Sequence, residues 1–320
     1  MTDPLAPLAS LPGVPEAAEA ARDALSKVHR HRANLRGWPV TAAEAAVRAA
    51  RSSSALDGGT MKLSADGAVE DPVLAGALRV GQALDGDALT QLAAVWSRAP
   101  LQALARLHVL AATGMADEDT LGRPRPGVDT DRLELLAQLI SGGTSVPAPI
   151  LAAVTHGELL ALNPFGSADG VVARAASRLV TVSRGLDPHA LGVPEVMWMR
   201  QSGRYRELSS AFAQGTPEAI TAWIVFCCQA LTAGAAEATS IADTAAASRL
   251  RRPTTLLPLS RRAPRGCRGP CWDSRFGRSV LLFRIDLGLV GLPYLLSTLS
   301  GRSHQGAILK VITLLPARQK

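Results

Sequence analysis

A short glycine-containing loop between two apolar segments constrains the fold of this chain more than any other feature. Residues 150–162 carry apolar side chains at helical spacing, and this segment runs into Asn163-Pro164. Proline removes a backbone donor and clashes with the preceding turn, so the first helix is expected to stop there. Residues 171–182 then form a second apolar segment. Its first amides would have no acceptor within their own helix, so the sequence predicts a central helix-loop-helix whose second N-terminus suits an anion.

The composition favours an all-helical protein. Of 320 residues, 47% are hydrophobic and only 4% are aromatic, and no run of residues resembles a convincing strand. A chain of this length buries one sizeable core, or a core plus an appendage. We therefore predict an all-α domain over residues 1–250. Helical patterns cover residues 15–28, 42–55 (with Thr41 as N-cap), 72–84, 87–97, 100–112, 131–140, 149–162, 171–182 and 217–249, with short helices between 194 and 208.

The last 70 residues differ in kind from the rest. Residues 251–320 hold 13 Lys and Arg but two acidic residues, whereas residues 1–250 hold 21 and 25. The segment is irregular, without capping signals or clean periodicity, and its abrupt change is typical of a tail foreign to the domain or read in a shifted frame. We expect it to be poorly ordered. A nucleic-acid arm is the functional alternative, but interleaved aromatic residues are almost absent.

Other features bound the cellular context. Four cysteines are too few for a disulfide framework, and Cys227 and Cys228 are expected to be core thiols. No basic and apolar leader is visible at the start of the chain. An apolar run at residues 279–299 carries Arg284 and Asp286, which argues against a membrane span. We therefore expect a cytoplasmic protein with neither nucleic acid nor membrane as partner.

The loop and the start of the following helix contain the motif NPFGSADGVVAR, residues 163–174. This motif resembles that of the Fic (Fido) family, H-P-F-x-[DE]-G-N-G-R-x-x-R, whose members mostly transfer AMP from ATP to a protein hydroxyl. Four positions match the family: Pro164, Phe165, Gly170 and Arg174. His156, seven residues before Asn163, stands where the family often has a helical histidine. The resemblance implies a Fic-like helical domain with a core at 100–185 and C-terminal helices at 194–249.

A second, upstream segment carries part of the same resemblance. Residues 53–58 read SSALDG, which is similar to the inhibitory motif S/T-x-x-x-E-G/N on an N-terminal helix of many Fic proteins. In the family, that glutamate pairs with the last arginine of the main motif and prevents productive binding of the ATP γ-phosphate. The resemblance implies that the helix at 41–57 is of this inhibitory type, with Ser53 and Asp57 facing Arg174.

Most chemical positions of the motif differ from the family. Asn163 replaces the histidine that acts as general base, and an amide cannot take a proton, which costs roughly 10²–10⁴ in rate. Ser167 replaces the acidic residue that holds Mg²⁺ and is a weaker ligand for a hard cation. Asp169 places a carboxylate where the family binds phosphate and is also expected to cap the helix amides. Val171 replaces the first arginine.

The resemblance therefore indicates a Fic-like protein with lost or much reduced transferase activity and a nucleotide-binding or protein-interaction role. Pro164 and Phe165 are expected to be structural. If ATP and Mg²⁺ bind, the resemblance assigns the contacts to these residues: Gly166, Ser167, Asp169, Gly170 and Arg174. One alternative is an active nucleotidyl or phosphoryl transferase with a rearranged site, in which Asp169 holds Mg²⁺ and His156 is the base. Another is an all-helical interaction protein without a nucleotide site.

Several further patterns are weaker. The cluster His29-Arg30-His31-Arg32 could contact phosphate or metal, although such a cluster is more often a solvated helix end. His108 is expected to be a hydrogen-bonded core histidine. Residues 121–127 are similar to the segment before the substrate-positioning flap of Fic domains, but strand formers are scarce, so the flap is expected to be short or missing. Dinucleotide-binding and P-loop motifs are absent from the sequence.

Overall fold

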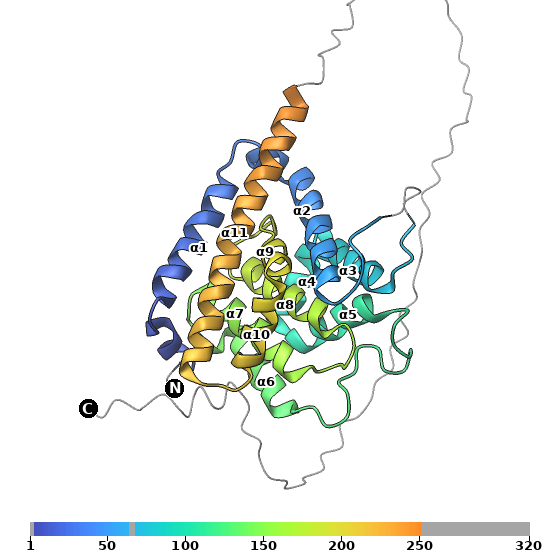
Figure 1. The fold of residues 1–320 in the computed structure, drawn as a ribbon, viewed down its shortest axis with the longest axis vertical. Coiled ribbons are helices and arrows are strands. Elements are labelled where there is room, and N and C mark those ends of the chain that lie inside the picture. The colour runs from blue at the N-terminus through green and yellow to red at the C-terminus, as the bar shows by residue number, and fades with distance from the viewer. Residues whose placement is uncertain (1–2, 64–67, 251–320) are drawn as a thin grey trace, which may run out of the picture. The chain divides into compact units, whose positions relative to one another are not determined.

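The computed structural model describes residues 3–63 and 68–250, and these form an all-α structure (Figure 1). Within these residues there are 11 α-helices and no strand. The α-helices are α1 (Val14–His29), α2 (Asn34–Leu56), α3 (Pro72–Ala83), α4 (Gly86–Arg98), α5 (Pro100–Ala112), α6 (Thr130–Gln138), α7 (Ala148–Leu162), α8 (Asp169–Ser183), α9 (Pro194–Arg200), α10 (Ser202–Phe212) and α11 (Pro217–Leu250). The 3-10 helix η1 (Ala6–Ser10) precedes α1, and the π-helix η2 (Leu139–Gly143) follows α6. The expectations for residues 251–320 lie outside the described part of the chain.

The predicted central helix pair is α7 and α8. The two helices pack against each other, α7 is also covered by α11, α10 and α1, and α8 is covered by α5, α4 and α2. Helix α7 is mostly apolar and is buried on every side, polar His156 and Glu158 included, as expected of a helix with neighbours all around it. Gly157 allows α10 and α11 to approach α7 closely, because a Cβ there would lie 2.7 Å from both the Phe212 ring and Trp223 Nε1.

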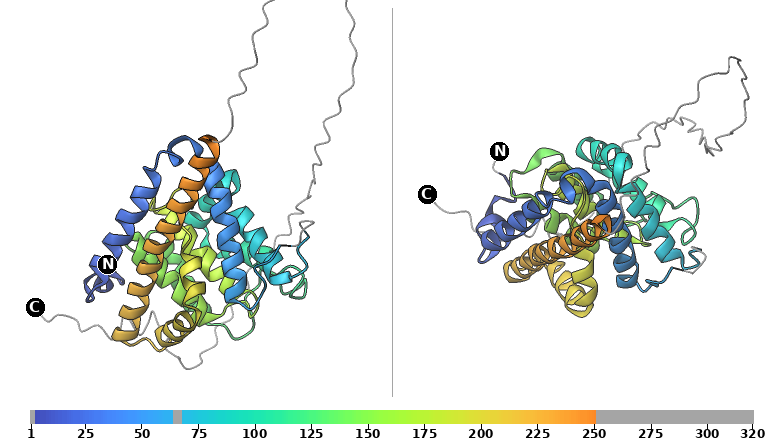
Figure 2. Two further views of the ribbon diagram at one scale, coloured as in Figure 1. Left: turned by 45° about the horizontal axis from the view of Figure 1, so that its top comes forward. Right: turned by 90° about the horizontal axis from the view of Figure 1, so that it is seen from above.

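Helix α11 is the longest element and lies beside α1, as both views in Figure 2 show. It also packs against α9, α7, α10 and α2. Its length and composition would suffice to cross a membrane, but 56% of its most apolar window is buried inside the structure. Core helices of globular proteins pass the same test. Cys227 and Cys228 are buried on this helix, which confirms their prediction as core thiols.

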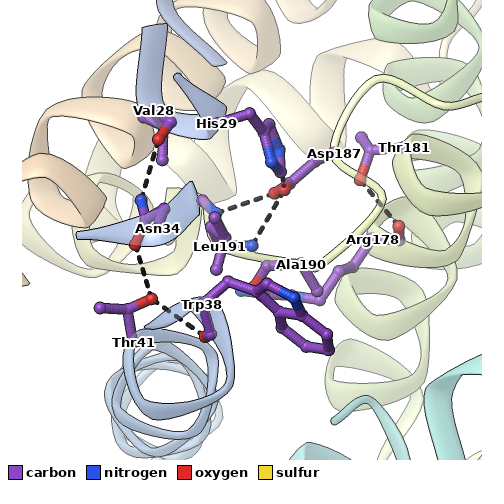
Figure 3. Close-up of polar contacts among 11 residues, drawn as sticks. Val28, His29, Asn34, Trp38, Thr41, Arg178, Thr181, Asp187, Ala190 and Leu191 are labelled. Atoms are coloured by element: carbon purple, nitrogen blue, oxygen red, sulfur yellow. Dashed lines mark hydrogen bonds and ion pairs between the residues drawn. The ribbon is translucent and has the colours of Figure 1, made fainter. Parts of the chain in front are cut away.

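Helix α2 begins at Asn34, so the prediction of a helix starting after Thr41 is wrong. Asn34 organises the corner between α1 and α2 (Figure 3): its Nδ2 donates to the carbonyl of Val28 at 2.8 Å, and its Oδ1 accepts from Thr41 Oγ1 at 2.8 Å. The same hydroxyl hydrogen is shared with the Trp38 carbonyl, whose oxygen lies 3.0 Å from Thr41 Oγ1. The helix therefore continues through Pro39, and Thr41 lies within the helix, where it stabilises the second turn instead of capping the N-terminus.

Candidate functional site

The loop between α7 and α8 is held in a left-handed conformation at both ends. Asn163 has φ 45° and Ala168 has φ 52°, a region that asparagine tolerates better than most residues. Arg125 fixes the first half of the loop, because its Nε donates to the Asn163 carbonyl at 2.7 Å and its amide donates to the Pro164 carbonyl at 2.8 Å. The only sequence signal for Arg125 was its place in the 121–127 segment.

Phe165 and His108 form the underside of the loop. Phe165 is 9% exposed, and its ring stacks on the His108 imidazole with centroids 4.2 Å apart and planes 5° apart. His108 Nδ1 accepts from the Gly122 amide at 2.9 Å, so Nε2 carries the proton that is donated to Ser167 Oγ at 3.0 Å. Burial lowers the pKa of His108. The structure confirms that Phe165 is buried and that His108 is a hydrogen-bonded core residue; it also shows that the Ser167 hydroxyl is already engaged.

Asp169 is the first residue of α8, and it does not cap that helix. Its Oδ1 accepts from the Phe165 amide at 3.0 Å, so the carboxylate joins the end of the loop to its beginning. The prediction that Asp169 caps the α8 amides is therefore wrong, because the left-handed Ala168 turns the side chain back toward the loop. Within the described residues, Asp169 Oδ2 is buried without a hydrogen-bond partner. Burial raises the pKa of Asp169 to about 6.

Asp57 lies at the N-terminus of α8, where the sequence predicted an anion. Its Oδ2 is 2.7 Å from Arg174 Nη2, which confirms the predicted pairing of these two residues as a direct contact. The Arg174 side chain is 2% exposed and that of Asp57 26%. Ser53 completes the arrangement, because Arg174 Nε donates to its Oγ at 2.8 Å and Nη2 donates to its carbonyl at 3.0 Å. A carboxylate at this place is favoured by the helix dipole as well as by the guanidinium.

His156 lies behind this ion pair. It has no exposed surface, and its Nε2 is 2.8 Å from Tyr205 Oη, which also accepts from Arg174 Nη1 at 3.3 Å. Burial, and secondarily the charge of Arg174, places the pKa of His156 well below 6.5, while burial raises the pKa of Tyr205 to about 12. His156 is therefore a neutral core group. Tyr205 was not found from the sequence, where nothing links it to the motif.

A small pocket of about 260 Å³ opens over the loop. It brings together most of the predicted site residues, and its lining consists of Asp57, Val73, Met115, Asn163, Gly166, Ser167, Ala168, Asp169 and Gly170. Two carboxylates line it and no cationic side chain does, whereas Arg174 and His156 lie outside the lining. In the described part of the chain, no group of three or more His, Cys, Asp or Glu side chains is arranged to hold a metal ion.

Comparison with known proteins gives no further guide: no protein-family model matches the chain, and no curated protein matches it. Function is therefore inferred from the chemistry of the site.

Proposed function

We propose that residues 1–250 form a Fic-like helical domain that does not transfer AMP and that acts by binding a protein partner. One observation carries the proposal: Asp57 and Arg174, which are 117 residues apart in the sequence, form a direct ion pair at the N-terminus of α8. The upstream and central segments were each singled out by their own resemblance to the family, and their contact is the one that the family's inhibitory arrangement requires.

The absence of transferase activity follows from the chemistry at the loop. Asn163 offers no base for a target hydroxyl. The Ser167 hydroxyl is hydrogen-bonded to His108, and a neutral hydroxyl is a poor ligand for Mg²⁺. The rearranged-site alternative needs His156 to take a proton from a substrate, yet this side chain is fully buried against Tyr205. These contacts favour a binding role over a rearranged catalyst.

Electrostatics also oppose nucleotide binding at the α8 N-terminus. The Asp57 carboxylate lies where a phosphate would meet the helix amides, and Asp169 lines the same pocket. Two like charges about 4 Å apart repel by roughly 4 kcal/mol at an effective dielectric constant of 20. An incoming phosphate would have to displace Asp57 from Arg174 and would leave a buried guanidinium to be neutralised by the nucleotide alone.

Calorimetric titration of the full chain with ATP, with and without Mg²⁺, tests the proposal together with an assay for transfer of labelled AMP. We expect no saturable binding at micromolar ATP and no labelled protein. Asp57→Ala should still fail to transfer AMP, because the base is absent. Asp131→Ala, which removes an exposed carboxylate on α6, is the control. Tight Mg²⁺-dependent binding or labelled product from the natural chain would contradict the proposal.

The Fic resemblance itself can be tested by restoring the motif. The substitutions Asn163→His, Ser167→Glu, Ala168→Gly, Asp169→Asn and Val171→Arg would be combined with Asp57→Gly. If the helical scaffold is Fic-like, this variant should gain Mg²⁺-dependent ATP binding and measurable AMP transfer. A folded variant, verified by circular dichroism, that binds no ATP would instead favour an all-helical interaction protein unrelated to the family.

A further inference from the structure

The corner between α1 and α2 turns its histidines inward. His29 Nε2 lies 2.9 Å from Oδ1 of the buried Asp187 (Figure 3), whose carboxylate also accepts the amides of Leu191 and Gly192. His31 Nε2 lies 3.2 Å from Asp243 Oδ1 on α11. Together with the Asn34 hydrogen bonds, these contacts hold the corner in a defined conformation.

The arginines of the same segment point into solvent. Arg30, Arg32 and Arg36 are all exposed. Within the described residues none of them forms an ion pair, and the one hydrogen bond among their side chains is donated by Arg30 Nη1 to Ser26 Oγ at 2.8 Å. The cluster His29-Arg30-His31-Arg32 was interpreted as a solvated helix end. This is confirmed for its arginines, whereas both histidines contact carboxylates. This corner therefore presents three exposed cations that have no ion-pair partner among the described residues.

The outward face of α2 beside these arginines is apolar. Leu35 is 66% exposed and Val40 is 62% exposed, the two highest values among the exposed large hydrophobic side chains, and Pro39 and Ala43 are exposed on the same face. The solvent face of a helix is normally polar, and adjoining exposed apolar side chains mark interaction surfaces more often than isolated ones do. The first turns of α2 thus have an apolar face toward solvent and another toward the core.

A groove of about 510 Å³ runs beside this face, between α2 and α11. Its lining comes from one stripe of each helix: Val40, Glu44 and Arg48 on α2, and Ile241, Thr244, Ala245 and Ser248 on α11. The two helices run antiparallel, because His31 contacts Asp243 whereas the later Arg48 contacts the earlier Glu237. A groove between antiparallel helices with small residues on one wall suits a third helix.

The charge on this surface is polarised. Arg48, at one end of the groove, is already paired with Glu44 and Glu237. Arg32 and Arg36 precede the lining residue Val40 in the sequence and mark what we call the arginine end. Within the described residues they have no carboxylate partner, and Asp243 on α11 is paired with His31, so the unsatisfied charge at this end is positive. We propose that the α2–α11 groove binds an amphipathic helix of a partner protein, with its apolar face in the groove and its carboxylates at the arginine end.

Two other occupants fit less well. A bilayer surface is flat and would leave the groove unfilled, with Glu44 facing its anionic headgroups. The chain's own residues 251–320 carry 13 Lys and Arg against two acidic residues, so their charge has the same sign as that of the arginine end. Only an acidic helix satisfies both the groove and the arginines. This inference rests on the partner binding proposed above and names the surface for it. The absence of AMP transfer depends on the α8 loop instead and is tested separately by the ATP titration and the AMP-transfer assay.

A displayed library of random 18-residue helical peptides, selected on the folded full chain, tests the inference. We expect enriched peptides to carry apolar residues at i, i+3, i+4 and i+7 with Asp or Glu clustered near one end. The affinity of one such synthetic peptide should fall about tenfold or more in Arg36→Glu and in Val40→Glu. Both side chains are exposed, so neither variant should unfold the protein.

Matched substitutions on other helices provide the controls. Arg98→Glu changes an exposed arginine on α4, and Leu101→Glu changes an exposed leucine on α5; both should bind the peptide like the natural chain. The inference is overturned if no peptide is enriched, or if the enriched peptides bind Val40→Glu unchanged, as ligands of the basic 251–320 segment would. Binding to phosphatidylserine-containing vesicles is measured for two further comparisons. If Arg36→Glu abolishes vesicle binding while Thr244→Trp, which fills the groove, leaves it unchanged, the surface is assigned to a membrane instead.

Discussion

The carboxylate of Asp57 lies so close to Gly170 that a Cβ atom at Gly170 would be 2.5 Å from Asp57 Oδ1 and 2.6 Å from Oδ2. The glycine at the start of α8 is therefore required by the side chain of Asp57, the residue that follows α2, and not by its own backbone conformation. The contact allows Asp57 to reach both Arg174 and the first turn of α8. The loop residues, the ion pair and the helix N-terminus form one packed unit.

Gly170→Ala should lower the free energy of unfolding by about 1–3 kcal/mol, because the added methyl group must displace the Asp57 carboxylate. In an Asp57→Gly background the same substitution should cost much less. Gly203→Ala on α10 is the control, since a Cβ there meets no atom within 4 Å. Urea denaturation measures the natural chain, the two single variants, the double variant and the control; equal costs of Gly170→Ala in both backgrounds would show that Asp57 is not the obstacle.

Arg174→Ala and Asp57→Ala should each destabilise the fold. Breaking a buried ion pair costs about 3–5 kcal/mol. The lower end is expected for Asp57→Ala, because that side chain is 26% exposed and Ser53 and Tyr205 remain as partners for Arg174. The double mutant should lose less than the sum of the single losses, by about 0.5–3 kcal/mol. Denaturant titration of the complete cycle measures this coupling; strict additivity would mean that the pair contributes no interaction energy.

Asp169 should make stability depend on pH. Burial raises its pKa from 3.8 to about 6, so the folded state binds a proton that the unfolded state has already released between about pH 4 and pH 6. The free energy of unfolding therefore falls as the pH rises through this window, and the loss above about pH 6 is roughly 3 kcal/mol.

Asp169→Asn removes this titration and keeps an oxygen that can accept from the Phe165 amide. The variant should match the natural chain near pH 4 and be more stable at pH 7, by roughly 1–3 kcal/mol. Thermal and urea unfolding from pH 4 to pH 7 provide the test. Parallel stability curves for the two proteins would rule out a raised pKa at this position.

Phe165→Ala should cost about 3–5 kcal/mol, because it removes the ring that stacks on His108 and leaves a cavity beneath the loop. Phe165→Leu should recover much of this loss by refilling the volume. A loss below about 1 kcal/mol for the alanine variant would show that the loop is held chiefly by Arg125.

The sequence predicted local structure better than it predicted side-chain partners. The helix at 100–112 has the bounds of α5, since an N-terminal proline and regular apolar spacing are local signals. The start of α2 was missed because the bond between Thr41 and Asn34 and the contact of His29 with Asp187 are set by the packed corner. A local pattern contains no information about such contacts.

The candidate site shows the same division. A motif resemblance brought together Ser53, Asp57 and Arg174, although they come from distant segments. It could not indicate Tyr205 or the engagement of Ser167 by His108, because these partners come from helices outside the motif. The prediction that Asp169 caps α8 failed for a further reason. The direction of the Asp169 side chain depends on the left-handed backbone of Ala168, and an alanine in the sequence does not predict that conformation.

The pairing of α1 with α11 bears on how this protein is made. On the inner face of α1, Val14, Ala21, Leu25 and Val28 are each 0–1% exposed, and α11 is the principal neighbour of that helix. At a synthesis rate of about 5–20 residues per second, the roughly 190 residues between the two helices take about 10–40 s to leave the ribosome. Until then the nascent N-terminal helix lacks its principal packing partner, so we expect the apolar face of α1 to stay available to chaperones during translation.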